Sequence, residues 1–396
     1  MLIIFFLLFI SSRAAATQRL FYLDVNTVGR GGANYGLSKG MSAFFYNPAG
    51  FASEQLDGGL LIWDHTLALE GNTYSAIRQF LTLPPSTDTA PIYTSQSFFD
   101  IVNKLQTADI EFVNSGPVGI IGYMRRYFGF LLYTEEYLNV NIDEGNVLFM
   151  PIPDPDDSIN FLSGANAIAE LSGAAKYRML DFGVNVKYYE KAYAKGNIPL
   201  MTLLSMDNSV IDTFTKEISK VYRENYFSVD VGMRYRITDY FILGLAANDV
   251  YTFYKRGAIY NINTAGGMGV SKSSFLYTAP PMRLSMGLSY LMDLPYYINI
   301  PRLGLIYSRH TLFTFDIQDF LNKEDFFKKI NFGIETELRD FLKLRGGFYQ
   351  GYPVFGFGLN FFHYYFLDYA FYTEERGQYT GWKPHYMHII RFMIKI

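Results

Sequence analysis

The sequence predicts an all-β fold: a transmembrane antiparallel β-barrel of about 14 strands with an N-terminal plug, or hatch. Three observations predict it. The chain begins with a short apolar segment, apolar and polar residues alternate from Gly58 to the C-terminus, and the composition is aromatic but poor in charge. A barrel strand turns one face to lipid and the other to the lumen, so alternation along most of a chain is typical of this fold.

The composition favours membrane-crossing strands over helices. Aromatic residues make up 18% of the chain, and charged residues also make up 18%, against about 25% charged residues in an ordinary soluble protein. Mean hydropathy is only +0.05, whereas a helical membrane protein needs about 20 consecutive apolar residues for each span. No uninterrupted apolar run of that kind follows the first segment.

Charge and residue types exclude several classes of function. A net charge of −3 argues against a nucleic-acid-binding surface. The absence of cysteine excludes disulfides and thiolate metal sites. The five histidines form no H-E-x-x-H pair, and the acidic run at residues 154–157 has too few ligands for calcium. We therefore expect no metal, no cofactor, no nucleic-acid partner and no enzyme activity.

Residues 1–16 are interpreted as a signal peptide. The apolar run Leu2–Ile10 is too short to span a bilayer, and small residues follow it up to Ala16. No positive charge precedes the run, which departs from the usual pattern.

Residues 58–396 are expected to form the barrel. Its clearest strand is 227–238, where one face is apolar and the other polar and charged. The predicted apolar face consists of Phe227, Val229, Val231, Met233, Tyr235 and Ile237. The charged residues of such strands are expected to line a wet lumen and to pair across it.

Short and long connections alternate along the barrel. Tight links near residues 125, 179, 238 and 339 are typical of periplasmic turns. The longer links near 71–116, 141–162, 194–225 and 255–280 are predicted to be extracellular loops. Residues 292–310 could be a turn or part of another strand.

Residues 17–57 form a different kind of segment. They are rich in glycine, alanine, serine and asparagine and show no sustained alternation. Their aromatic residues disfavour a disordered tail, so we expect this segment to lie in the lumen as a plug.

Two motifs in this segment resemble the start of the FadL family of outer-membrane long-chain fatty-acid transporters. One is the Gly29-Arg30-Gly31-Gly32-Ala33 stretch, and the other is Asn47-Pro48-Ala49-Gly50 just before the first strand. The C-terminal third resembles an uncharacterised spirochaetal branch of that superfamily and the barrel partners of a bacterial secretion system. The residues proposed for the hatch and its gating are Gly29, Gly31, Gly32, Asn47, Pro48 and Ala49.

The resemblance implies residence in the outer membrane and uptake of hydrophobic small molecules, with long-chain fatty acids as the leading class. Ligand capture at extracellular loops would precede hatch-gated passage and lateral exit into the membrane. The alternatives are a partner-binding or structural barrel, such as a secretion-system shuttle or surface adhesin, and then a porin. The oligomeric state stays open.

The third long loop carries an apolar tract, Ile198–Met206, that is unusual for a segment facing water. Such a tract is either a ligand groove or the packing face of a lid. The proposed ligand-binding residues are Leu200, Met201, Leu203, Leu204 and Phe214.

Export provides the first testable prediction. We expect the mature protein to begin close to residue 17 and to fractionate with the outer membrane, because the apolar run and small residues form a cleavage signal. N-terminal sequencing after membrane fractionation measures this. Cytoplasmic protein that retains Met1 would contradict it.

Overall fold

The computed structural model describes residues 24–53, 59–70, 110–114, 119–143, 158–199, 220–263, 269–275, 280–293, 296–300, 304–338, 341–362, 364–375, 377, 379–382 and 384–396. The predicted signal peptide lies outside this set, as do all five proposed ligand-binding residues, Leu200, Met201, Leu203, Leu204 and Phe214. Among the described residues, no helix is long and apolar enough to cross a membrane.

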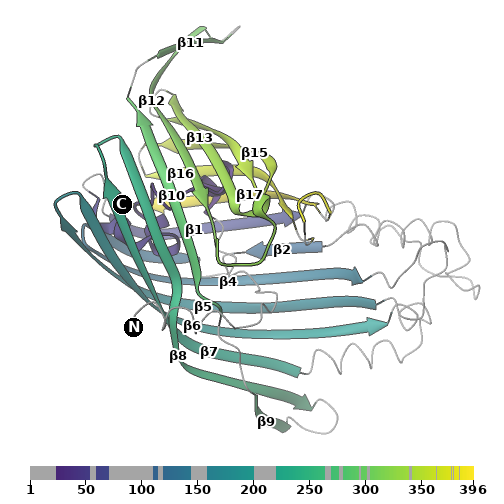
Figure 1. Ribbon diagram of the computed structural model, residues 1–396. Helices are drawn as coiled ribbons and strands as arrows, with labels where there is room; N and C mark the ends of the chain where they lie inside the picture. The colour runs from purple at the N-terminus through teal and green to yellow at the C-terminus, as the bar shows by residue number, and fades with distance from the viewer. Residues whose placement is uncertain are drawn as a thin grey trace, which may run out of the picture.

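Strands make up almost all of the described chain after the first 30 residues (Figure 1). The helical elements are α2 (Val25–Gly29), α3 (Ser42–Phe45), the 3-10 turn η1 (Pro48–Ala52) and α8 (Phe326–Lys329). The strands are β1 (Gly59–Glu70), β2 (Ile110–Asn114), β3 (Ile120–Arg125), β4 (Phe128–Asp143), β5 (Ser158–Tyr177), β6 (Leu180–Pro199), β7 (Lys220–Arg236), β8 (Phe241–Asn263), β9 (Gly269–Phe275), β10 (Arg283–Met292), β11 (Tyr296–Ile300), β12 (Gly304–Ile317), β13 (Ile330–Leu338), β14 (Leu342–Tyr349), β15 (Tyr352–Phe361), β16 (Tyr365–Glu375) and β17 (Pro384–Lys395).

Antiparallel pairing closes these strands into a ring. Strands β3 to β8 and β12 to β17 pair in chain order, β10 pairs with both β8 and β12, and the first strand β1 pairs with the last strand β17 over Leu61–Glu70. β2 and β3 share one position between β1 and β4, and β9 and β11 pair with the far ends of β8 and β12, beyond the parts that pair with β10. The described residues therefore form a closed antiparallel barrel of 14 strands, which confirms the predicted barrel and its strand number.

The wall of this barrel is uneven in height. Strands β4 to β8 contain 16 to 23 residues, whereas β13 to β16 contain 8 to 11. A strand of about 9 to 11 residues is enough to cross a bilayer. The long strands therefore rise beyond the rim at the end away from the tight turns (Figure 1).

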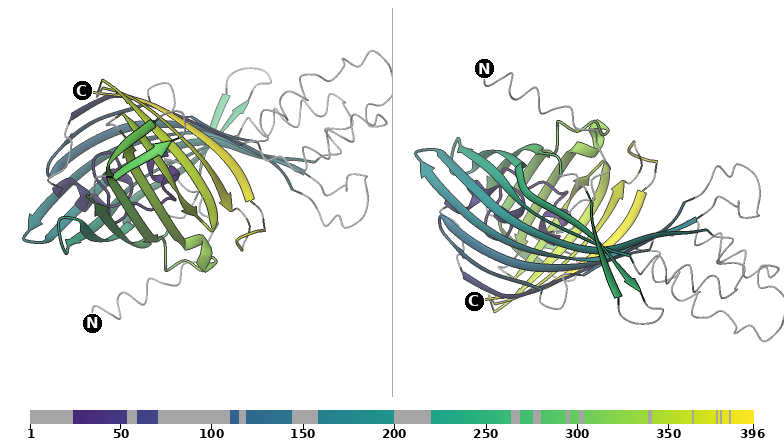
Figure 2. Two further views of the ribbon diagram at one scale, coloured as in Figure 1. Left: turned by 90° about the horizontal axis from the view of Figure 1, so that it is seen from above. Right: turned by 90° about the horizontal axis from the view of Figure 1, so that it is seen from below.

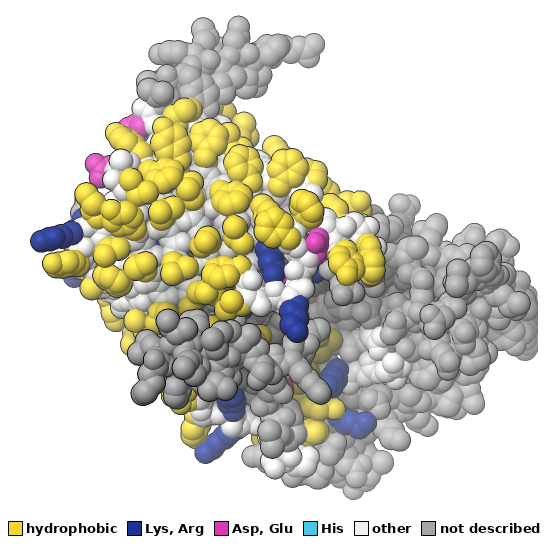
Figure 3. Space-filling view, in the orientation of Figure 1, with side chains coloured by type: hydrophobic (Ala, Val, Ile, Leu, Met, Phe, Trp, Pro, Cys, Tyr) yellow, Lys and Arg dark blue, Asp and Glu magenta, His cyan; other side chains and the backbone are white. Residues whose placement is uncertain are grey.

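Alternation along the strands separates a lipid-compatible outer face from an enclosed inner face. On β7, Val231 and Tyr235 are exposed, whereas Asp230 and Arg234 are buried. This confirms the faces predicted for that strand. Hydrophobic side chains cover the outer face over β10, β12, β13 and β15 (Figure 3).

The stretches predicted as loops contain strand residues at their ends. β2 occupies residues 110–114 of the predicted loop 71–116, β4 and β5 extend into 141–162, β6 and β7 into 194–225, and β8 and β9 into 255–280. The alternation fades in these stretches because a strand above the membrane meets water on its outer face, and apolar residues are then no longer needed there.

Within residues 292–310, left open between a turn and a strand, the described residues form two paired antiparallel strands. β11 pairs with the first half of β12 from Tyr296↔Ser308 to Ile300↔Gly304. Figure 1 shows β11 beside the start of β12 at the top of the view.

The outer face provides a stability prediction. Val186, 40% exposed near the middle of the crossing part of β6, should not tolerate a charge in lipid. We expect Val186→Arg to lower the free energy of unfolding in lipid vesicles by about 2–4 kcal/mol. Urea titration followed by heat-dependent gel mobility measures this difference.

Tyr177, 63% exposed beside the tight turn after β5, provides the matched control. Tyr177→Arg should cost only about 0–1 kcal/mol, because an arginine near the interface reaches water. Equal costs at both positions would show that the outer face does not contact lipid as proposed.

Candidate functional site

Residues 24–53, called the inner segment below, lie on the enclosed face of the barrel. The three short helical elements α2, α3 and η1 belong to this segment, and almost all of their residues are buried. Both views in Figure 2 place it, in purple, within the curve of the strands. Its contacts extend from β4 to β8 and on to β17, so it touches most of the ring.

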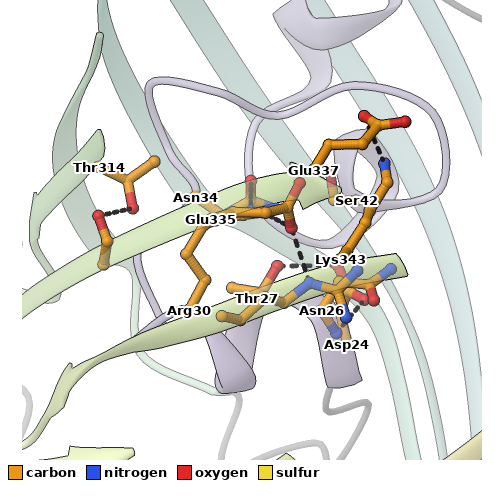
Figure 4. A network of polar contacts seen from close by, with 12 residues as sticks. Asp24, Asn26, Thr27, Arg30, Asn34, Ser42, Thr314, Glu335, Glu337 and Lys343 are labelled. Atoms are coloured by element: carbon orange, nitrogen blue, oxygen red, sulfur yellow. Dashed lines mark hydrogen bonds and ion pairs between the residues drawn. The ribbon is translucent and has the colours of Figure 1, made fainter. Parts of the chain in front are cut away.

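The first helix of the inner segment begins at a capping aspartate. The carboxylate of Asp24 accepts hydrogen bonds from the backbone N–H of Asn26 (3.2 Å) and the hydroxyl of Thr27 (2.8 Å). These bonds satisfy groups that a helix N-terminus leaves free. Figure 4 shows Asp24 with Asn26 and Thr27. The same carboxylate lies 3.1 Å from the guanidinium of Arg391 on β17, so Asp24 both starts α2 and presents a charge to the wall.

A chain of alternating charges joins the two ends of α2 through the barrel wall. Successive N···O distances along it are 3.1, 2.8, 2.9, 2.7 and 3.1 Å. Its members, in order, are Asp24, Arg391, Asp368, Arg345, Glu335 and Arg30. Figure 4 shows Arg30 and Glu335 facing each other. Buried charges require such compensation, because removing one partner leaves an uncompensated charge.

Wall side chains also bind the backbone of the inner segment directly. The buried carboxylate of Asp316 on β12 accepts hydrogen bonds from the backbone N–H groups of Asn34 and of Tyr35, the latter at 2.9 Å. Arg234 on β7 donates to the carbonyl oxygen of Ser38 (2.8 Å), and Gln318 donates to that of Gly32 (2.7 Å). These bonds replace the water that an irregular buried backbone would otherwise need.

Asn47, a residue predicted to act in gating, connects three parts of the structure. Its carboxamide oxygen accepts from the backbone N–H of Ala49 (3.1 Å), which caps η1. Its carboxamide nitrogen lies 3.0 Å from the carbonyl oxygen of Tyr35 and 3.2 Å from that of Met233 on β7. The Asn-Pro turn is thus also a bridge from the inner segment to the wall.

Glycines on the inner face let this backbone approach the strands. A Cβ added at Gly183 on β6 would lie 2.2 Å from the carbonyl carbon of Pro48, and one at Gly244 on β8 would lie 2.1 Å from the carbonyl oxygen of Tyr35. Real Cβ atoms do not approach other atoms so closely. At these positions the wall accepts the inner segment only because no side chain is present.

The predicted gating residues separate into two groups on different sides of the ring. Pro48 and Ala49 lie against Gly183 on β6. Gly29 lies against Gly356 and Ala370 on β15 and β16, and Gly31 lies against Phe332 on β13. Gly31 and Gly32 both have positive φ (72° and 77°), a conformation that favours glycine. The two motifs therefore fix opposite ends of one segment rather than forming one cluster.

The wall is interrupted at the position shared by β2 and β3. From Asn114 to Ile120 the chain advances six residues, whereas the paired residues on β4 advance only three, from Glu136 to Tyr133. Regular antiparallel pairing advances equally on both strands, so the pairing with β4 is interrupted between Asn114 and Ile120.

The C-terminal part of the inner segment, which carries Phe44 and Phe51 and is called its apolar end below, packs beside this interruption. Phe44 and Phe51 contact each other with ring centroids 4.8 Å apart. They pack in one cluster with Leu61 of β1, Ile120 of β3 and Leu131 of β4, which flank the interruption. The backbone N–H of Tyr127, in the turn after β3, donates to the carbonyl oxygen of Phe51 (2.8 Å).

Sequence reasoning located the inward charges but not their partners. They were expected to line a wet lumen and to pair across it, whereas Arg234 and Arg345 are buried. Arg234 binds Asp181 and the carbonyl oxygen of Ser38 in the inner segment. Arg345 binds Asp368 and Glu335, and Glu335 in turn binds Arg30 of the inner segment. Asp24, Asp316 and Asn185 were missed; the carboxamide of Asn185 on β6 donates to the carbonyl oxygen of Phe44 (2.7 Å). Only Asn185 has a signal in the sequence, the inward glycine Gly183 two residues before it on β6. Within the described chain, no group of acidic residues and histidines could hold a metal ion.

Comparison with known proteins finds likeness only among solved structures. No protein-family model matches the chain, and no curated protein matches it. The toluene transporter TbuX of Ralstonia pickettii is 12% identical, with 94% of this chain and 98% of that chain covered and a TM-score of 0.46. The toluene transporter TodX of Pseudomonas putida is 10% identical, with 94% and 96% covered and a TM-score of 0.42. The monoaromatic hydrocarbon channel CymD is 9% identical, with 93% and 96% covered and a TM-score of 0.40.

These solved structures are FadL-family hydrocarbon transporters, the family that the sequence motifs resemble. The geometry of the chain itself defines its class. It is a 14-stranded antiparallel barrel of the outer-membrane type with residues 24–53 bound to its inner face.

The close approach at Gly183 generates a prediction. Gly183→Val should displace η1 from the wall, because its Cβ would overlap the backbone of Pro48 and Ala49. We expect the variant to insert normally but to conduct ions better than wild type in planar bilayers. Deletion of residues 17–57 should give the largest conductance, since it removes the whole segment.

Gly173→Val is the matched control, because an added Cβ at Gly173 on β5 meets nothing within 4 Å. Its conductance should equal that of wild type. If the deletion conducts no better than wild type, the inner segment does not block the lumen.

Proposed function

We propose that the protein takes up hydrophobic small molecules across the outer membrane, with long-chain fatty acids as the leading substrate class. The observation that carries the proposal is the apolar contact of Phe44 and Phe51 with the strands on both sides of the wall interruption. No bond is made or broken in this function. The protein supplies a path and a gate.

The apolar character of the contact made by Phe44 and Phe51 explains why an apolar molecule is the proposed substrate. An apolar ligand arriving at this contact would replace one apolar surface by another, whereas a polar solute would leave buried apolar groups facing it without compensation. In this proposal the ligand passes into the membrane at the interruption. A hydrophobic ligand gains about 25 cal/mol per Å² of apolar area removed from water there.

The proposed gating residues have separate roles in this scheme. Asn47, Pro48 and Ala49 fix η1 and therefore the position of Phe51. Gly29, Gly31 and Gly32 allow α2 to pack tightly against β13 to β16. Displacement of the apolar end could thus occur while the ionic chain keeps α2 attached.

Reconstitution into vesicles tests the proposed function. Proteoliposomes should accelerate transfer of a fluorescent long-chain fatty acid but exclude small sugars in a swelling assay. Because the similar solved structures include toluene transporters, toluene serves as a second ligand. Sugar permeation would favour a porin, and transfer of neither apolar ligand would favour a partner-binding barrel. Mass spectrometry of co-purified apolar molecules identifies the substrate independently.

The third extracellular loop provides a further prediction, although its residues lie outside the described chain. Leu200→Glu combined with Leu203→Glu should weaken fatty-acid binding about tenfold or more, because each buried leucine contributes about 1.5–3 kcal/mol. The added charges also repel a carboxylate. Met201, Leu204 and Phe214 belong to the same proposed surface. Binding of a fluorescent fatty acid to the solubilised protein measures the effect.

Leu200→Ser with Leu203→Ser separates lost apolar area from charge repulsion, and heat-dependent gel mobility checks folding. A folded glutamate variant that binds like wild type would make this loop a structural lid.

A further inference from the structure

The loop end of the barrel, which is the end away from the tight turns, has a tall side formed by β4 to β8 (Figure 1). On this side the outer face turns polar well before the strands end, at the directly paired residues Glu190, Asn225 and Arg256. β6, β7 and β8 all continue beyond this row. An outer face that becomes polar before its strands end stands in water from that level onward.

On the low side, formed by β12 to β17, the outer face stays apolar to the ends of the strands. Phe315 of β12, Phe332 of β13 and Phe348 of β14 are directly paired and exposed. All three lie next to the loop end of their strands, and β13 and β14 contain only 9 and 8 residues. Lipid therefore reaches the level at which the loops of the low side begin.

Two loops of the low side are joined by polar contacts. Together they are called the low lip below, and they consist of residues 318–329, which contain α8, and residues 377 and 379–382. The carboxylate of Asp325 accepts from the hydroxyl (3.0 Å) and the backbone N–H (3.3 Å) of Thr380. The ammonium of Lys328 donates to the carbonyl oxygen of Gly377 (3.1 Å). The two loops thus form one ordered unit.

Backbone groups of the low lip are bonded within the protein. Glu375, at the end of β16, accepts from the backbone N–H groups of Gly377 (2.6 Å) and Gly381 (2.7 Å). The backbone N–H of Trp382 donates to the carbonyl oxygen of Tyr379 (3.2 Å). These bonds take the place of bonds to water. A loop that meets lipid needs them, because lipid offers its backbone no partners.

The large apolar side chains of the low lip are exposed. Trp382 is 66% exposed and Phe327 is 62% exposed. The other exposed ones are Phe320, Leu321, Phe326 and Tyr379. The rings of Tyr379 and Trp382 contact each other with centroids 4.8 Å apart. Bonded polar groups inside and apolar groups outside reverse the arrangement expected of a loop that faces water.

We propose that the low lip lies in the head-group region of the outer leaflet, with lipid molecules as its binding partner. Tyrosine and tryptophan favour this region, because each side chain has an apolar body and one polar group. The lip continues the lipid-facing row of Phe315, Phe332 and Phe348 beyond the strands. The low side of the rim is then level with the lipid heads, while the tall side stands in water. This inference rests on the outer-membrane barrel and not on the uptake function.

Tryptophan fluorescence tests the proposal, because the chain has only two tryptophans, Trp63 and Trp382. Trp63→Phe leaves Trp382 as the sole emitter in the full-length protein, reconstituted in phosphatidylcholine vesicles. Phosphatidylcholine brominated near its head group should quench most of the Trp382 emission. Lipid brominated near the chain ends should quench less of it, because the lip lies at the membrane surface. Iodide on both sides of the vesicle should leave most of the emission.

Ala192→Trp, in a chain that also carries Trp63→Phe and Trp382→Phe, is the matched control. Ala192 is exposed on the outer face of β6, beyond the polar row of the tall side. Its emission should show the reverse pattern, with strong quenching by iodide and none by either brominated lipid. Heat-dependent gel mobility checks that each variant is folded.

Strong quenching of Trp382 by iodide, without quenching by brominated lipid, would overturn the proposal, because the low lip would then face water as a surface for another partner does. Equal quenching patterns for Trp382 and for the Ala192→Trp variant would overturn it as well, since the two sides of the rim would then not differ. Both results would leave the uptake function standing, because ligand transfer measures that function separately.

Discussion

The structure depends on the close approach between the backbone of residues 24–53 and the inner face of the strands. An irregular backbone inside a barrel must have its N–H and C=O groups bonded, because no regular ladder satisfies them. Asp316, Arg234 and Asn47 supply those bonds, and inward glycines such as Gly183 supply the space. Polar side chains and glycines on the wall therefore serve the same purpose, which is to let the backbone of the inner segment bind the strands.

The two ends of this segment are held by different forces. The α2 end is bracketed by a buried chain of ion pairs from Asp24 to Arg30, in which loss of one partner is costly. The other end rests on Phe44 and Phe51 beside the wall interruption. Apolar contacts are non-directional, so another apolar surface can replace them. In our account, ligand arrival acts at the apolar end and the ionic end stays in place.

Much of the barrel could be predicted from the sequence, because period-2 alternation assigns each residue to a face. Residues 227–238 show this, with Asp230 and Arg234 inward and Val231 and Tyr235 outward. Alternation does not reveal what an inward residue touches. In the sequence, Asp316 and Gly183 cannot be told from other residues that face the lumen. Only the structure shows that the backbone of the inner segment lies against them. The height of β4 to β8 was also missed, since strands above the membrane lose their apolar outer face.

Amide hydrogen exchange on the intact barrel measures the central claim, that the wall binds the backbone of residues 24–53. The account predicts that the amides of Asn34, Tyr35 and Gly50, which donate to Asp316 or within the segment, exchange as slowly as those of the neighbouring strands. Exchange of these amides at the rate of a free tail, with the strand amides still protected, would contradict it.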